Sequence, residues 1–169
     1  MLWPRGGMVT QRIANPFIPV RFWAWPPDIK ITMNQEIFKI ALNTENLSHL
    51  KNYTHFSKSK NSKCGDEIKI YLIIKNRKIV NFKYESESCI YCQASASLLS
   101  RNLKNEPVIK IKKFLSQAPF LFEKNKLSLN NSLKKFSKIM NKRNIARKEC
   151  LLLPLKGTLK ALIQKNIKK

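Results

Sequence analysis

Two runs of alternating apolar and polar residues, joined by a short polar stretch, constrain the fold of this chain more than any other feature. The apolar positions of these runs are Ile68, Ile70, Leu72 and Ile74, and then Val80, Phe82 and Tyr84. Because side chains on a strand point alternately to its two faces, each run predicts a strand with one buried face. The polar residues 75–78 between them predict a turn, whose type stays open because it contains no glycine. The chain is therefore expected to form an antiparallel hairpin.

Helical periodicity flanks this hairpin on both sides. Ahead of it, the sequence predicts a short helix at 36–42 and a short edge strand at 53–56. Behind it, apolar spacing predicts four helices, at 94–103, from Pro107 to about 115, from a cap at 131–132 to about 142, and from about 150 to 165. The core face of the last helix should carry Leu151, Leu155, Leu159, Leu162 and Ile163. The fold class is therefore α+β, a small three-stranded antiparallel sheet packed with helices.

Pro154 is expected in the first turn of that last helix, where a missing N–H costs little.

The first 32 residues differ in composition from the rest of the chain. They hold all three tryptophans and five of the eight prolines, but a single lysine, Lys30. We expect 1–32 to be an extension outside the fold and 33–169 to form one domain. An organelle presequence is the competing interpretation, since Arg5, Arg12 and Arg21 precede the first acid. The prolines oppose the amphipathic helix that a presequence needs, so a cytoplasmic location is favoured.

The chain is strongly basic, with 33 lysines and arginines, 10 acids and a formal charge of +23. Such a balance is typical of proteins that bind nucleic acid or anionic membranes. Here the lysines are spread along the chain from Lys39 onward, without an arginine-rich run or an aromatic stacking platform. A drift in composition is favoured over nucleic-acid binding. No stretch approaches about 18 consecutive apolar residues, so no membrane span is predicted.

The four cysteines, at 64, 89, 92 and 150, indicate a metal site. No export signal precedes them, and in a reducing compartment grouped cysteines are more often metal ligands than disulfides. Cys64 precedes the first hairpin strand and Cys89 follows the second, so the hairpin should make them neighbours. Cys150 opens the last helix, where the helix dipole should favour its thiolate. Three thiols can thus meet at one edge of the domain and bind zinc or iron.

Asp66 can supply a fourth, oxygen donor, because Gly65 permits a tight turn between it and Cys64. Cys92 is either a small buried residue or an additional participant in the site. A redox role for the pair Cys89 and Cys92 lacks the βαβ context that such pairs have. His49 and His55 are expected at the surface or in turns.

The segment 61–100 resembles the NifU N-terminal, IscU and SufU family of iron–sulfur cluster scaffolds. It carries the Cys-Gly-Asp ahead of a hairpin and a cysteine before an Ala-Ser-Ala-Ser helix, and the third family cysteine matches Cys150. The resemblance covers about 40–165 and implies a SufE/NifU-like fold. It implies the metal ligands Cys64, Asp66, Cys89 and Cys150. It also implies a non-enzymatic scaffold that assembles a [2Fe–2S]-type cluster, with a cysteine desulfurase, acceptor apo-proteins and other Suf or Isc assembly proteins as partners.

Two departures favour the SufU-like type within that family. The chain lacks the Leu-Pro-Pro-Val-Lys motif of IscU-type members, and Arg147-Lys148-Glu149 replaces their histidine before the third cysteine. A long helical stretch, 104–146, separates the second and third cysteines, as in SufU-like members. SufU-type proteins can bind zinc and accept persulfide sulfur. A zinc-dependent sulfur acceptor is therefore the alternative function, with Cys150 as the expected sulfur-accepting thiolate.

Overall fold

The computed structural model describes residues 35–122 and 134–164 of the chain. Two expectations fall outside these ranges. The extension predicted at 1–32 is one, and the helix cap predicted at 131–132 is the other.

The sheet has three antiparallel strands in the order β1-β2-β3, which confirms the predicted fold class. The strands are β1 (His55–Lys60), β2 (Glu67–Lys75) and β3 (Lys78–Glu87). The edge strand expected at 53–56 begins two residues later and extends to Lys60. Its inner residue Ser57 pairs with Ile70 of β2. The predicted hairpin is present, and its first strand, β2, is the central strand of the sheet.

A two-residue turn joins β2 to β3. Both of its residues have positive φ, 49° at Asn76 and 58° at Arg77. Two successive positive φ values are typical of a type I′ turn, whose twist matches that of the flanking strands. Asparagine tolerates this conformation well, which explains how the hairpin closes without glycine.

A bulge beyond this turn corrects one predicted core position. Ile74 pairs with Ile79 while Ile73 pairs with Asn81, so Val80 is an extra residue on β3. The bulge turns Ile79 into the core, where it is fully buried, and leaves Val80 39% exposed. The sequence-based assignment of Val80 to the buried face was wrong for this reason.

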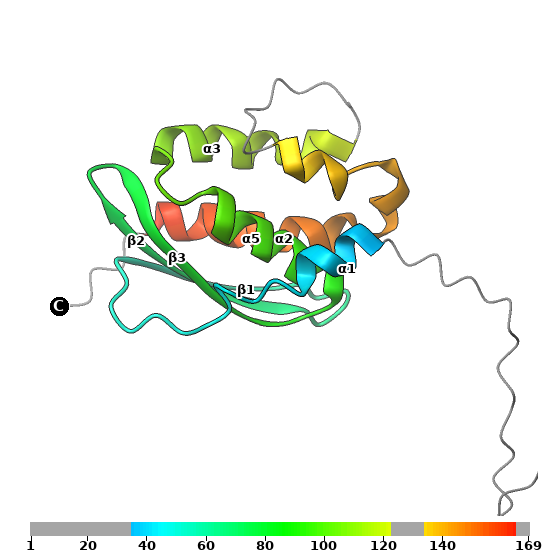
Figure 1. Cartoon of the computed structure of the whole chain (residues 1–169), viewed down its shortest axis with the longest axis horizontal. Helices are drawn as coiled ribbons and strands as arrows, with labels where there is room; N and C mark the ends of the chain where they lie inside the picture. Colours follow the sequence, from blue (N-terminus) through cyan, green and yellow to red (C-terminus); the bar gives the residue numbers. More distant parts are fainter. Residues whose placement is uncertain (1–34, 123–133, 165–169) are drawn as a thin grey trace, which may run out of the picture. The chain divides into compact units, whose positions relative to one another are not determined.

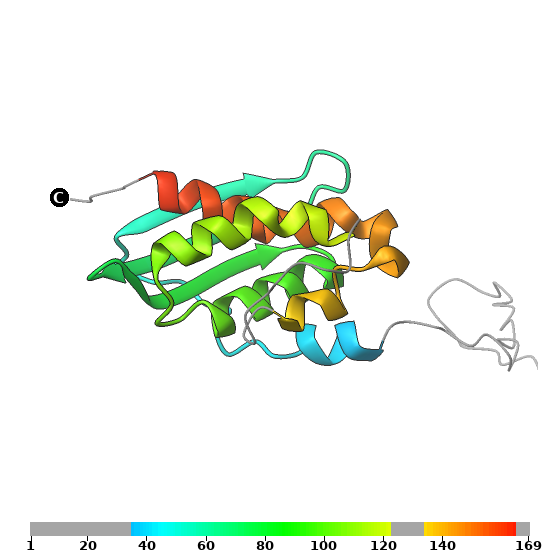
Figure 2. The same ribbon diagram turned by 90° about the horizontal axis from the view of Figure 1, so that it is seen from above.

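The helices all cover one face of the sheet (Figure 1). They are α1 (Gln35–Ala41), α2 (Ile90–Asn102), α3 (Val108–Gln117) and α5 (Lys148–Ile163), with short 3-10 helices η1 (Ala118–Phe122), η2 (Lys135–Lys138) and η3 (Lys142–Arg147). Seen from above, α3 and α5 run in roughly the strand direction (Figure 2). Within the described ranges, none of these helices combines the length and the apolarity that crossing a bilayer requires.

Four details of the helices differ from expectation. α2 begins at Ile90 rather than at 94, and the helix expected up to about 142 is represented by η2 and η3. α5 begins at Lys148, so Pro154 lies beyond the first turn and withholds a helical hydrogen bond from the carbonyl of Cys150. Ile163 ends α5 and is 69% exposed, so its assignment to the core was wrong.

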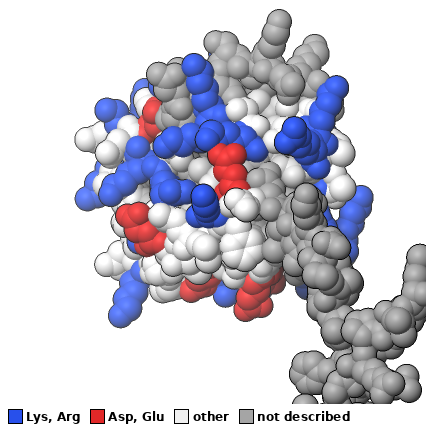
Figure 3. Space-filling model, turned by 45° about the vertical axis from the view of Figure 1, so that its right-hand side comes forward, with Lys and Arg blue, Asp and Glu red and all other residues white. Residues whose placement is uncertain are grey.

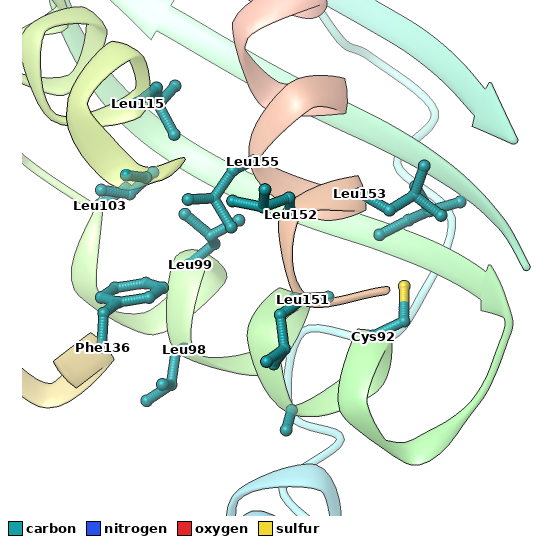
Figure 4. Packing of buried hydrophobic residues seen from close by; sticks show 14 of the residues in the cluster. Cys92, Leu98, Leu99, Leu103, Leu115, Phe136, Leu151, Leu152, Leu153 and Leu155 are labelled. Atoms are coloured by element: carbon teal, nitrogen blue, oxygen red, sulfur yellow. The ribbon is translucent and has the colours of Figure 1, made fainter. Parts of the chain in front are cut away.

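α5 packs against β1 and β2 of the sheet and against α2. Its leucines pack against leucines of α2 and α3 (Figure 4). Two buried hydroxyls donate to its backbone, Ser57 Oγ to the Gly157 carbonyl and Ser95 Oγ to the Leu151 carbonyl, each at 2.7 Å. A Cβ at Gly157 would lie 3.0 Å from Ile70 Cδ1, so glycine permits the close approach to β2. These contacts fix where the first turn of α5, and with it Cys150, lies.

Candidate metal centre

The sheet register brings the predicted ligands to one end of the domain. Lys60 pairs with Glu67 and Glu67 with Glu87, so the β1–β2 loop and the end of β3 lie at the same edge. Cys64 and Asp66 belong to that loop, and Cys89 caps the start of α2 just after β3. The first turn of α5 lies toward the same end (Figure 1). The prediction that the hairpin brings the segment before β2 beside the end of β3 is confirmed.

The β1–β2 loop is closed by its own backbone. The Asn61 N–H donates to the Asp66 carbonyl at 2.8 Å, and the Gly65 N–H donates to the Asn61 carbonyl at 2.9 Å. Gly65 has φ of 75°, in the left-handed region that favours glycine. The tight turn expected from this glycine is therefore present, and it turns the Asp66 side chain inward while Cys64 stays exposed.

Asp66 is a buried carboxylate with one oxygen in use and one without a partner. Its side chain is 5% exposed, and Oδ1 accepts the Cys89 N–H at 2.9 Å. Oδ2 is buried with no hydrogen-bond partner among the described residues. Burial alone would raise the pKa of Asp66, but the Cys89 N–H and the thiols of Cys89, Cys64 and Cys150 outweigh it and lower the pKa. Asp66 therefore presents a negatively charged oxygen to the cysteines at neutral pH.

The structure brings three of the four predicted ligands into one group. One donor atom each of Cys64, Asp66 and Cys150 lies within 4.8 Å of the others, and the two Sγ atoms are 3.8 Å apart. Two thiolates bound to one tetrahedral ion at 2.3 Å are separated by about 3.8 Å. The pair is thus spaced to bind a single metal ion, and with a carboxylate oxygen of Asp66 it forms a group of donors that suits zinc or iron.

Cys89 lies beside this group rather than within it. Its thiol interacts with the Asp66 carboxylate and the Cys150 thiol, and its backbone N–H holds Asp66 in place. Burial, above all, raises the pKa of Cys89. Its side chain is partly buried, between the exposed Cys64 and the buried Cys150. That Cys89 is the fourth ligand stays a prediction.

Burial overturns the expectation that the start of α5 favours a thiolate. Cys150 is the third residue of α5 but only 6% exposed. Loss of solvent, followed by the neighbouring thiols of Cys89 and Cys64, raises its pKa. Desolvation at Cys150 therefore outweighs the effect expected from the helix dipole. Cys64 is the exposed thiol of the group, and it is accessible from solvent without movement of α5.

The remaining candidates have structural explanations. Cys92 is fully buried among the leucines of the core (Figure 4), and burial raises its pKa to about 12. This environment favours the small-buried-residue interpretation over a fifth ligand. His49 lies 3.3 Å from a Glu85 carboxylate oxygen, and His55 Nδ1 lies 2.8 Å from Thr54 Oγ1. Neither histidine belongs to the group of donors.

A pocket of about 200 Å³ is lined by the residues that directly precede Cys64 and Cys150 in the chain, and no sequence pattern predicts it. It is lined by Lys60, Asn61, Ser62, Lys63, Glu149, Leu153 and Lys156. Lys63 directly precedes Cys64, and Glu149 directly precedes Cys150. Figure 3 turns the end of the domain where α5 begins toward the reader, and lysine and arginine side chains spread broadly over this face.

The chain matches the model of the NifU-like N-terminal domain over residues 32–118. It belongs to this family. The matched range contains Cys64, Asp66 and Cys89, and Cys150 lies beyond it.

Relatives of this family extend the match over most of the chain. A Thermotoga maritima protein named iron–sulfur cluster assembly scaffold protein IscU is 28% identical over 144 residues, which are 80% of this chain and 95% of the relative. An uncharacterized protein of Borreliella burgdorferi is 31% identical over 125 residues, 74% of this chain and 78% of the relative.

Two crystal structures share the fold. A NifU-like N-terminal protein of Brucella abortus superposes with a TM-score of 0.67 at 20% identity, over 77% of this chain and 91% of that one. A protein of Fervidobacterium islandicum, described as a candidate scaffold for the SUF system, gives a TM-score of 0.65 at 23% identity, over 76% and 94%. At this identity the likeness extends to the fold, a three-stranded antiparallel sheet covered by helices.

Proposed function

We propose that this member of the NifU-like family is an iron–sulfur cluster assembly scaffold. It binds iron and sulfide through Cys64, Cys89, Cys150 and Asp66 and passes the assembled cluster, of [2Fe–2S] type, to acceptor proteins. In this role the cluster is the cargo of the protein, and the chain acts as a carrier rather than an enzyme, in keeping with its family.

The observation that carries this proposal is the unpartnered Oδ2 of Asp66. A buried carboxylate oxygen without a hydrogen bond costs free energy in the metal-free protein, of the order of 1–3 kcal/mol. A cation beside Cys64 and Cys150 would satisfy it. Oxygen binds iron less tightly than thiolate does, so a ligand set with one carboxylate also favours release of the cargo.

The exposure of the thiols indicates which of them receives sulfur. We had expected Cys150, but its burial and raised pKa oppose this role. Cys64 is the exposed thiol. Its sulfur would attack the outer sulfur of a persulfide on a cysteine desulfurase, so that Cys64 gains the persulfide and the donor leaves as a thiolate. An external two-electron reductant then converts the bound sulfane sulfur to sulfide and restores the Cys64 thiol.

Anaerobic reconstitution with ferrous iron and sulfide tests the proposal. The wild-type protein should develop the visible absorption of a thiolate-bound cluster, with about two irons per cluster. Cys64→Ala, Cys89→Ala and Cys150→Ala should each lose most of this absorption. Cys92→Ala is the matched control and should retain it. If the three ligand variants keep the wild-type spectrum, the protein does not assemble a cluster at this site.

A zinc-dependent sulfur acceptor is the second candidate. The 3.8 Å separation of Cys64 Sγ and Cys150 Sγ suits a single tetrahedral zinc ion as well as an iron ion. Metal analysis of protein purified without oxygen separates the two functions. One zinc per chain, together with stimulation of a desulfurase that is lost in Cys64→Ala, would favour the zinc function. Iron and sulfide in equal amounts would favour the scaffold.

Partners and location follow from this chemistry. A cysteine desulfurase and acceptor apo-proteins are the partners that such a scaffold requires. The four cysteines are free thiols, which accords with the reducing environment of the cytoplasm. The absence of the Leu-Pro-Pro-Val-Lys motif from the sequence favours the SufU-like type.

A further inference from the structure

The pocket beside the thiols combines concavity with positive charge. Three of its seven lining residues are lysines, Lys60, Lys63 and Lys156, and one is an acid, Glu149. The lining therefore carries a formal excess of two positive charges. Leu153 adds an apolar wall, and Asn61 and Ser62 add polar groups. Such a lining suits a carboxylate-bearing segment better than an apolar or a cationic one.

Charge alone does not distinguish this pocket, because the whole chain is basic at +23. What distinguishes it is a carboxylate already present within it. Glu149 Oε2 accepts a hydrogen bond from Lys156 Nζ at 2.7 Å. Both side chains are roughly half exposed, at 47% and 58%, so an incoming carboxylate can reach Lys156 from solvent. The internal pair demonstrates the geometry in which the pocket holds a carboxylate.

The position of the pocket connects it to the thiols. Lys63 is joined to Cys64 and Glu149 to Cys150, and Glu149 and Lys156 lie on α5 with Cys150. A protein segment bound across the pocket would therefore lie beside the exposed Cys64 thiol. A sulfur donor docked there would need little movement to present its persulfide.

We propose that this pocket is the docking site for an acidic segment of the sulfur-donating protein, whose carboxylate replaces Glu149 on Lys156 while Lys60 and Lys63 hold neighbouring acids. The proposal rests on the proposed function insofar as that function requires a sulfur donor. It adds the chemistry by which the donor is recognised and the residues that recognise it.

A fluorescein-labelled hexaglutamate peptide, with hexaglutamine as its uncharged counterpart, probes the pocket directly. Fluorescence anisotropy at low salt should show hexaglutamate binding. Lys156→Gln should weaken it about five-fold, as expected for loss of one partly exposed ion pair. Glu149→Gln should strengthen it about three-fold, because it removes the competing carboxylate.

Lys138 and Glu36 provide the matched control. Their ion pair also has a 2.7 Å separation and similar exposures, 59% and 44%, and neither residue lines the pocket. Lys138→Gln and Glu36→Gln should change the affinity less than about 1.5-fold. Equal effects in the two pairs would mean general attraction to a basic protein and would overturn the proposal. A DNA oligonucleotide serves as a second probe. If Lys156→Gln weakens binding of DNA as much as binding of hexaglutamate, the proposal is also overturned, because the pocket would then bind polyanions of any class.

The identity of the occupant is tested with a cysteine desulfurase at sub-saturating concentration. Labelling of this protein with persulfide sulfur should fall about five-fold in Lys156→Gln and stay unchanged in Lys138→Gln. Unchanged labelling in Lys156→Gln would overturn the assignment of the sulfur donor as occupant.

Reconstitution with iron and sulfide separates failure of this inference from failure of the proposed function. Lys156→Gln should assemble the cluster normally, since free sulfide bypasses the donor. If the cluster assembles normally but hexaglutamate binding does not change in Lys156→Gln, only the docking site is overturned. Pocket-dependent peptide binding in a wild-type protein that assembles no cluster overturns the scaffold but not the docking site, and the persulfide labelling then decides whether the occupant is a sulfur donor.

Discussion

Replacing Asp66 with asparagine separates the structural contribution of this side chain from its contribution to metal binding. The asparagine oxygen can keep the hydrogen bond that Oδ1 accepts from the Cys89 N–H at 2.9 Å. Its amide group takes the place of Oδ2, the buried oxygen that has no partner. A charge-assisted hydrogen bond becomes a neutral one, which should lower the free energy of unfolding of the metal-free protein by about 1 kcal/mol.

The cost to the metal-bound protein should be considerably larger. The amide nitrogen is a donor and cannot bind a cation, so one of the proposed ligands is lost. If the affinity for metal falls about 100-fold while metal remains in excess, the stabilisation by metal falls by about 2.7 kcal/mol. At about 3 °C per kcal/mol for a protein of this size, the metal-dependent rise in Tm should shrink by about 8 °C.

Thermal unfolding followed by circular dichroism, with zinc and with chelator, measures both effects. Glu67→Gln is the matched control, because it neutralises the adjacent carboxylate, which pairs with Lys58 instead. This control should keep the full metal-dependent rise in Tm. The reasoning about Asp66 would be refuted if Asp66→Asn also kept it, or if the metal-free variant lost much more than about 1 kcal/mol.

Four further predictions concern the thiols and α5. The thiols of Cys89 and Cys150 have raised pKa values and are protonated near neutral pH, so metal binding should release at least two protons and strengthen as pH rises, which calorimetry in buffers of different ionisation enthalpy can count. For the same reason the metal-free protein should lose stability above about pH 9, because these thiols then ionise in the unfolded chain but resist ionisation in the folded one. An unchanged denaturation midpoint up to about pH 10.5 would contradict this prediction. Gly157→Val should lower the free energy of unfolding by about 2–3 kcal/mol, because even a Cβ would lie 3.0 Å from Ile70 Cδ1, whereas Gly157→Ala should cost less, since alanine improves helix propensity. Ser95→Ala should cost about 1–2 kcal/mol through loss of its buried hydrogen bond to the Leu151 carbonyl, and the exposed Ser116→Ala should change the urea midpoint little.

The sheet was predictable because the alternation of apolar and polar residues is a local signal. The one wrong assignment in it, Val80 on the buried face, also has a local cause. Ile79 and Val80 are both apolar, so the pattern alone does not say which of them faces the core. The bulge decides it, and the bulge depends on how the turn at Asn76 and Arg77 aligns the strands. Ile163 continues the apolar stripe of α5 but is the last residue of the helix and is largely exposed. Its exposure depends on tertiary packing, which periodicity does not report.

The site was predictable as far as the hairpin determines it. Antiparallel pairing placed Cys64 and Asp66 near Cys89, and the Asp66–Cys89 hydrogen bond bears this out. The contact between the Cys64 and Cys150 thiols depends on the packing of α5, which no sequence pattern specifies in detail. Burial of Cys150 depends on the same packing and reverses the effect expected from the helix dipole. The basic pocket was not predictable, because its lysines come from two separate segments and do not stand out in a lysine-rich sequence.

The spacing of the ligands along the chain gives a bound metal a second consequence. Cys64 and Cys150 are 86 residues apart in sequence, and Asp66 and Cys89 are 23 apart. An ion bound by these residues links distant segments as a crosslink would. An unfolded chain that retained the ion would have to close loops of this length, which would lower its conformational entropy. Occupancy should therefore make unfolding of the sheet, α2 and α5 more cooperative. Release of the cargo would free the β1–β2 loop and the first turn of α5 to open separately, so an emptied carrier would differ from a loaded one in its hydrogen-exchange protection.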